Sequence, residues 1–152
     1  MPERVGEIKR QQRRLYKSVW EVLAMIFEIN MKLPSLNEYI NVCRTNKFKA
    51  AKFKADIEEQ IGYFLLKMPK YNKPIAIHFH WVEGSKRRDL DNVAFAKKFI
   101  LDEMVKLGKL KDDNRKHVTA FTDTFSYGKE TKVILEVKEV IEDEASRRDS
   151  NA

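Results

Sequence analysis

Strict alternation of apolar and polar residues predicts two β-strands in the first half of the chain. Residues 24–32 carry Met25, Phe27 and Ile29 on one face, because successive side chains of a strand point to opposite sides of the sheet. Residues 75–83 repeat the pattern. The apolar face of this second strand consists of Ile75, Ile77, Phe79 and Trp81.

Two further alternating stretches lie near the C-terminal end. Residues 117–127 and 131–141 are rich in β-branched and aromatic residues, and a short turn with Gly128 and Lys129 separates them. Two such runs joined by a short glycine turn are typical of a β-hairpin. We therefore expect these two strands to pair directly with each other.

Helical spacing of apolar residues predicts two helices between the first two strands. Residues 47–67 form a long amphipathic pattern. A shorter helix is expected over 36–41, where Ser35 is a good N-cap and Glu38 occupies the capping-box position. The apolar stripe of the longer helix consists of Phe53, Ile57, Ile61, Phe64 and Leu65.

A third helix is predicted to begin just after Asp91 and to end before Gly108, which suits the C-terminal cap. Five apolar residues share one face of it, namely Val93, Ala96, Ile100, Met104 and Leu107. Helices and strands are therefore mixed without a regular βαβ alternation. This order favours an α+β fold, with a small mixed sheet packed against helices.

The 152-residue chain has the length of one domain with short appendages. We expect the folded domain to cover residues 25–141. A basic helical extension is expected over 1–24, and a polar tail over 142–152.

The chain is strongly basic, with a formal net charge of +7 and a sequence pI of about 9.4. A basic protein of this size tends to bind a polyanion, most often nucleic acid, and the alternative is an ordinary lysine-rich surface. No apolar run approaches the roughly 20 residues of a membrane span. The single Cys43 cannot form an internal disulfide, so a reducing, cytoplasmic compartment is expected. We expect Cys43 to be a small buried apolar residue.

Two acidic pairs flank the third helix. Asp89 and Asp91 precede it, and Asp112 and Asp113 follow it. Carboxylates two residues apart in extended chain point the same way, and oxygen ligands are those that Mg²⁺ prefers. The pairs can thus converge on one divalent ion acting on a phosphate.

Each acidic residue also has a purely structural explanation. Asp91 is a possible helix N-cap, and Asp112-Asp113-Asn114 suits a turn. Asp89 would form a salt bridge with the neighbouring arginines. Lys98 lies nearly two helical turns after Asp91, hence on the same face, and is placed to stabilise charge on a reacting phosphate. Its alternative role, compatible with the first, is an i,i+4 salt bridge to Asp102.

Clusters of cations suit a nucleic-acid backbone, with ordinary solvated faces as the alternative. The candidates for phosphate contacts are Arg44, Lys47, Lys49, Lys52, Arg87 and Arg88. Three aromatic residues near the lysines, Tyr39, Phe48 and Phe53, are candidates for base stacking, but the sequence does not favour this role. The pair His78 and His80 has no third ligand that would indicate a zinc site, so a pair of surface histidines is expected.

These motifs resemble the RusA-type Holliday junction resolvases, a family common in bacteriophages and prophages. The matching residues are Arg88-Asp89-Leu90-Asp91-Asn92, the helix with Lys98, and Lys111-Asp112-Asp113. The segment Leu33-Pro34-Ser35-Leu36-Asn37-Glu38-Tyr39 is similar to the motif that follows the family's first strand. The resemblance covers residues 25–141.

The resemblance implies a Mg²⁺-dependent endodeoxyribonuclease, with Mn²⁺ as a possible substitute, that acts in DNA recombination and repair. Such an enzyme is a homodimer that binds four-way DNA junctions and resolves them by paired symmetric nicks. The family's catalytic aspartates fall on Asp89, Asp91 and Asp113, with Asp112 as a further metal ligand, and its catalytic lysine falls on Lys98.

The chain departs from the family pattern in two places. Counting back from the Asp112-Asp113 pair places the catalytic lysine on Lys98, but counting forward from Asp91 places it on Phe95. Lys97 is therefore an alternative to Lys98. Family members also often start at the first strand, so residues 1–24 are additional to the pattern.

Two other functions remain open from the sequence. In one, the chain is a non-catalytic nucleic-acid-binding module, and the aspartates are caps and turns. In the other, it is a related nuclease acting on other branched DNA or on RNA, because the same metal site would serve.

Overall fold

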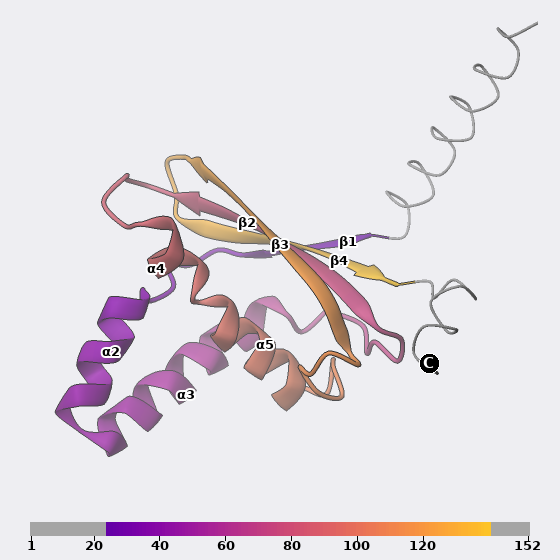
Figure 1. The fold of residues 1–152 in the computed structure, drawn as a ribbon, viewed down its shortest axis with the longest axis horizontal. Helices are drawn as coiled ribbons and strands as arrows, with labels where there is room; N and C mark the ends of the chain where they lie inside the picture. The colour runs from indigo at the N-terminus through magenta and orange to yellow at the C-terminus, as the bar shows by residue number, and fades with distance from the viewer. Residues whose placement is uncertain (1–23, 141–152) are drawn as a thin grey trace, which may run out of the picture.

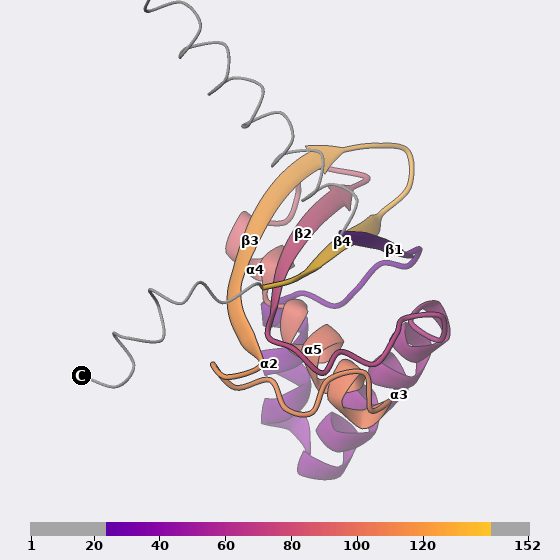
Figure 2. The same ribbon diagram turned by 90° about the vertical axis from the view of Figure 1, so that its right-hand side faces the viewer.

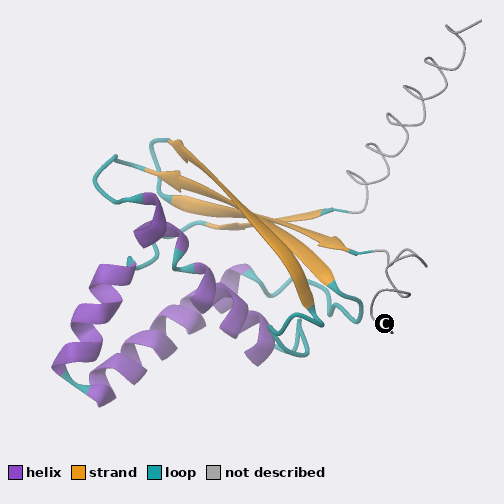
Figure 3. Cartoon of the chain, in the orientation of Figure 1, coloured by secondary structure: helices purple, strands orange, loops and turns teal. Residues whose placement is uncertain are grey.

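The computed structural model describes residues 24–140, in which a four-stranded mixed sheet is covered on one face by helices (Figures 1 and 3). The expected helical extension lies outside these residues, apart from Ala24, as does the expected polar tail over 142–152. The elements in chain order are β1 (Met25–Ile29), α2 (Leu36–Thr45), α3 (Lys47–Phe64), β2 (Ile75–Glu83), α4 (Leu90–Ala94), α5 (Lys97–Lys106), β3 (Val118–Tyr127) and β4 (Lys132–Glu139). This confirms the expected α+β class.

The strand order in the sheet is β1-β4-β2-β3. Strand β4 runs antiparallel to both of its neighbours, whereas β2 and β3 are parallel. The expected hairpin between 117–127 and 131–141 is therefore wrong, because β2 lies between the two strands that were expected to pair.

Burial explains why β4 occupies the centre of the sheet. Its inward residues Val133, Leu135 and Val137 are at most 3% exposed, and Leu135 lies opposite residues of both β1 and β2. Strand β3 is more polar and occupies the edge. The more regularly apolar strand, β4, therefore takes a central position, and the more polar β3 takes the edge. Local turn signals do not encode this preference.

The connection from β3 to β4 crosses the end of β2. The N–H of Gly128 donates to the carbonyl of Glu83 at 3.0 Å. A Cβ on Gly128 would lie 3.0 Å from Cγ1 of Val82. Glycine therefore allows this close crossing, which replaces the turn of a hairpin.

The core lies between the sheet and the helices (Figure 2). In β2, Ile75, Ile77, Phe79 and Trp81 are all at most 2% exposed, as the alternation predicted. His78 and His80 lie on the opposite face and contact hydroxyl groups of β3. These contacts place them as a surface pair, as expected.

Helices α2 and α3 meet at a corner of one residue. The N–H of Asn46 donates to the carbonyl of Val42 at 3.4 Å, and its Oδ1 accepts the N–H of Phe48 at 2.8 Å. Asn46 therefore ends α2 and caps α3 at the same time. Helix α2 is longer than the 36–41 expected, and its Ser35 cap is confirmed by a 3.2 Å contact with the N–H of Glu38.

The single helix expected from Asp91 is present as two helices, α4 and α5. The link between them is wound with i→i+3 hydrogen bonds, such as Lys98 N–H to the Phe95 carbonyl at 3.0 Å. The argument that Asp91 and Lys98 share one face of a straight helix is therefore wrong. Gly108 has a φ of 71°, as expected of a residue just beyond a helix end.

Cys43 is exposed on α2, so the expectation that it would be buried is wrong. No helix within residues 24–140 combines the length and apolar character needed to span a membrane.

Candidate active site

Arg88 anchors the loop that carries the first acidic pair. Its Nε lies 3.2 Å from Oε2 of Glu83, its Nη2 contacts the other carboxylate oxygen, and its Nη1 donates to the carbonyl of Leu33 at 2.7 Å. The side chain is only 14% exposed. Arg88 thus ties the residue before Asp89 to the end of β2 and to the segment after β1. Three of its five donors are used inside the protein.

Asp89 and Asp91 lie beside this anchor, at the start of α4. Asp89 is the N-cap residue but makes no capping hydrogen bond, and Asp91 lies in the first turn. Both are exposed, and neither forms an ion pair with any residue of the range 24–140. The structural explanations considered for these two residues, a cap at Asp91 and a salt bridge at Asp89, are therefore not the arrangement found.

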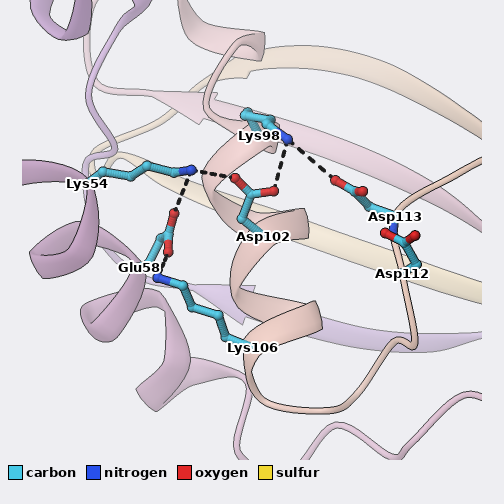
Figure 4. A network of polar contacts seen from close by, with 7 residues as sticks. All are labelled: Lys54, Glu58, Lys98, Asp102, Lys106, Asp112 and Asp113. Carbon is cyan, nitrogen blue, oxygen red and sulfur yellow. Dashed lines mark hydrogen bonds and ion pairs between the residues drawn. The ribbon is translucent and has the colours of Figure 1, made fainter. Parts of the chain in front are cut away.

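Lys98 meets the second acidic pair. Its Nζ lies 2.9 Å from Oδ1 of Asp102 and 3.5 Å from Oδ2 of Asp113 (Figure 4). The hydrogen bond to Asp102 raises the pKa of Lys98, and the charge of Asp113 acts in the same direction. Lys98 therefore carries a positive charge at neutral pH, and its side chain is 55% exposed.

Lys97 points elsewhere, toward the sheet. Its Nζ lies 2.6 Å from Oδ2 of Asp123 in β3, and it sits over the ring of Phe121 at 4.3 Å. Asp123 also accepts the indole N–H of Trp81 at 2.8 Å. Of the two neighbouring lysines, Lys98 is therefore the one that contacts the acidic pair 112–113.

The loop with Asp112 and Asp113 divides their roles. The two carboxylate oxygens of Asp112 accept the N–H of Asp113 at 2.8 Å and the side-chain amide of Asn114 at 3.0 Å. Asp112 thus builds the turn, which is the structural role considered for it. The carboxylate of Asp113 is free of that turn and faces Lys98 (Figure 4).

The four aspartates do not form one cluster. Within residues 24–140 no group of three or more Asp, Glu, His or Cys side chains is close enough to hold a metal ion. Their carboxylate oxygens have the right chemistry for Mg²⁺. The donor set therefore fits the ion chemically, but the arrangement does not hold three ligands together.

A network of charges between α3 and α5 supports Lys98 from below (Figure 4). Asp102 contacts Lys98 and, at 2.8 Å, Lys54 of α3. Burial alone would raise the pKa of Asp102, but hydrogen bonds from the two lysines outweigh it and lower the pKa. The sequence did not indicate Lys54 as a partner of Asp102, because spacing within one helix predicts only i,i+4 contacts such as Lys98–Asp102.

The same network continues to a fully buried carboxylate. Glu58 is 0% exposed and pairs with Lys106 of α5, while its Oε1 lies 3.5 Å from Lys54. The pairing holds α3 and α5 in register beneath Lys98. Removing one partner of such a buried pair leaves an uncompensated charge.

The remaining candidate cations lie away from these contacts. All are exposed, and none forms an ion pair within the part of the chain that the structure describes. They are Arg44, Lys47, Lys49 and Lys52 at the α2–α3 corner, and Arg87 in the loop before α4.

A scan against models of known protein families gives no match to this chain. A search of curated proteins also finds no similar sequence. The case for a function therefore stands on the sequence motifs and on the geometry of the site.

Proposed function

We propose that the chain is a divalent-metal-dependent, structure-selective endodeoxyribonuclease that resolves four-way DNA junctions by paired nicks, as its resemblance to RusA-type resolvases implies. The observation that carries the proposal is the contact of the exposed Lys98 with Asp113. Asp89 and Asp91, at the start of α4, are also exposed and form no ion pair within residues 24–140. Exposed carboxylates that make no capping hydrogen bond or ion pair within these residues are available to bind a ligand.

The proposed roles follow the geometry. Lys98 would stabilise negative charge that develops on the reacting phosphate, because it is a preorganised and exposed cation. Asp102 and Lys54 would hold it in position. The resemblance and the exposed carboxylates of Asp89 and Asp91 support these residues as metal ligands.

The resemblance assigns Asp89, Asp91 and Asp113 as Mg²⁺ ligands, with Asp112 as the fourth candidate. Since no three of them lie together within residues 24–140, this assignment requires the two acidic pairs to approach each other when the ion and DNA bind. Bound Mg²⁺ or Mn²⁺ would polarise the phosphate and lower the pKa of a coordinated water. Asp112 accepts one hydrogen bond on each carboxylate oxygen in its own turn, so its orientation is fixed by that turn and only its remaining lone pairs are available to an ion.

Phosphate contacts are proposed for the exposed cations Arg44, Lys47, Lys49, Lys52 and Arg87. Arg88 is better suited to positioning Asp89, since its guanidinium is bound to Glu83 and Leu33. A four-way junction has two-fold symmetry, which supports a homodimer. A cytoplasmic location is proposed because the single Cys43 cannot form an internal disulfide.

The test is cleavage of a synthetic four-way junction in Mg²⁺, with the Asp91→Asn variant beside the unchanged chain. We expect paired symmetric nicks from the unchanged chain and none in EDTA. Asp91→Asn is expected to lose cleavage but to keep junction binding, because it removes a metal ligand and no structural contact. Asp56→Asn is the matched control, since Asp56 is exposed on α3 and lies away from the site.

A second function is favoured by one observation, the lack of a three-ligand cluster within residues 24–140. In that case the chain binds nucleic acid without cutting it. Salt-dependent junction binding without nicks in Mg²⁺ or Mn²⁺ would establish this alternative and refute the nuclease. Cleavage of flaps or RNA in preference to four-way junctions would instead indicate a related nuclease.

A further inference from the structure

Phe48 is the most exposed large apolar side chain in residues 24–140, at 87%. It lies in the first turn of α3, at the corner where α2 and α3 meet (Figure 1). At 3.6 residues per turn it falls roughly on the opposite side of α3 from the fully buried Ile61. The body of the protein therefore cannot cover it.

The backbone around Phe48 is nevertheless well defined. Its N–H donates to Oδ1 of Asn46 at 2.8 Å, which starts the helix at this point. An aromatic ring held on a capped helix end loses little further backbone freedom when it binds a partner. The ring is thus presented to solvent by a fixed corner and not by a free loop.

The charges around Phe48 identify the partner. Between Glu38 and Asp56 the chain has no acidic residue, but it has five cations, which are Arg44, Lys47, Lys49, Lys52 and Lys54. Only Lys54 forms an ion pair within the residues that the structure describes. Lys47 and Lys49 lie in the first turn of α3, where cations are unfavourable for the helix dipole, so these two do not serve helix stability. A polyanion is their complement.

We propose that this cationic tip, formed by Arg44, Lys47, Phe48, Lys49 and Lys52, grips one arm of branched DNA and stacks Phe48 on a base that is unstacked at the branch. The cations contact the phosphates, and the ring supplies a sequence-independent platform for the base. That the partner is branched DNA rests on the proposed function. A membrane is less well matched, because a helix that binds a bilayer needs a broad apolar face and the tip offers one ring.

A line of side chains connects the tip with the candidate active site. Lys47 and Lys54 are seven residues apart, hence on one face of α3. Lys54 contacts Asp102, which contacts Lys98 (Figure 4). A DNA arm held at the tip can therefore follow this face toward Lys98.

The experiment measures binding of a four-way junction that carries 2-aminopurine at the branch, in EDTA, so that no cleavage occurs. The variants are Phe48→Ala and Phe48→Trp. The matched control is Tyr63→Ala, because Tyr63 is also an exposed aromatic residue of α3, at 69%, but lies at the other end of the helix. Vesicles of phosphatidylcholine and phosphatidylserine form a separate arm.

We expect Phe48→Ala to bind the junction about 10-fold more weakly and to lose the change in 2-aminopurine fluorescence, a loss typical of one stacked base. Phe48→Trp should restore both signals, and Tyr63→Ala should match the unchanged chain. Equal junction binding and fluorescence for Phe48→Ala would overturn the proposal. So would a loss confined to the vesicles.

Cleavage assays separate this inference from the proposed function. If the junction is nicked but its binding does not depend on Phe48, the proposed role of the cationic tip is refuted and the proposed nuclease activity is retained. If the 2-aminopurine signal depends on Phe48 but no nicks form in Mg²⁺ or Mn²⁺, the proposed nuclease activity is refuted and the tip is retained as a nucleic-acid contact.

Discussion

Two adjacent lysines at the start of α5 have separate partners, and this separation defines their roles. Lys97 is bound to Asp123 between α5 and β3, whereas Lys98 faces Asp113 at the surface. Of these two neighbours, Lys97 therefore connects α5 with the sheet, whereas Lys98 remains more than half exposed.

Lys98→Met should lower the rate of junction cleavage by roughly 10²–10³-fold, as the loss of one preorganised donor to a transition state does. Its free energy of unfolding should change little, because the side chain is 55% exposed. Lys97→Met should instead lower the free energy of unfolding by about 1–3 kcal/mol, because it leaves Asp123 without its cation. Parallel measurements of cleavage and urea unfolding test both. The reverse pattern would assign the catalytic role to Lys97.

Tyr71 gives a prediction about alkaline pH. Its hydroxyl is buried without a hydrogen-bond partner within residues 24–140, and burial, aided by the charge of Glu139, raises its pKa to about 12. The unfolded chain loses this proton near its ordinary pKa of 10.0. Stability should therefore fall as the pH rises from about 10 to about 12.

Tyr71→Phe should remove this part of the alkaline loss, while leaving the free energy of unfolding at pH 7 unchanged or up to about 1 kcal/mol higher, since no hydrogen bond is lost. Urea unfolding at neutral and alkaline pH measures both effects. Tyr63→Phe, at an exposed position, is the control. A clear loss of stability at neutral pH would show that the hydroxyl has a partner.

At the scale of elements, α3 and α5 are joined by charges as well as by apolar contacts. Asp102 links Lys54 of α3 with Lys98 of α5, and its pKa is lowered by both. A lowered folded-state pKa stabilises the protein above the ordinary value of 3.8. That stabilisation is lost as the pH falls through the folded-state pKa.

Asp102→Asn should therefore lower the free energy of unfolding by about 1–3 kcal/mol at neutral pH. The difference from the unchanged chain should shrink as the solution becomes more acidic than the lowered pKa. Urea unfolding across the acidic range tests this, with the exposed Asp56→Asn as control. A difference that stays constant with pH would mean that packing, and not charge, connects the two helices at this point.

Patterns within one element were predictable, whereas partners between elements were not. Alternation gave the bounds and the buried face of β2, and Ser35 gave the start of α2. The same alternation misplaced β3 and β4, because a strand pattern specifies a face and not a neighbour. Lys54 was missed as a partner of Asp102 for the same reason.

At the scale of the whole molecule, the helices cover one face of the sheet (Figure 1). The contacts of Lys98 in the candidate active site lie on the helical layer and the loop that follows α5 (Figure 4). The motifs that the sequence indicated are present on the segments expected for them, at the start of α4 and after α5. What could not be predicted is their spacing in three dimensions, because the winding between α4 and α5 and the turn built by Asp112 depend on tertiary packing.

The central place of β4 also has a consequence for how the protein is made. Strands β1 and β2 do not pair with each other, and both pair with β4, so that Met25 lies opposite Val137. A ribosome releases β4 after all the other strands. Before β4 has been synthesised, β1 has no strand to pair with. The inner faces of β1 and β2 are then only partly covered. The sheet can therefore close only late in translation, in a step that depends on contacts distant in sequence, which fold slowly.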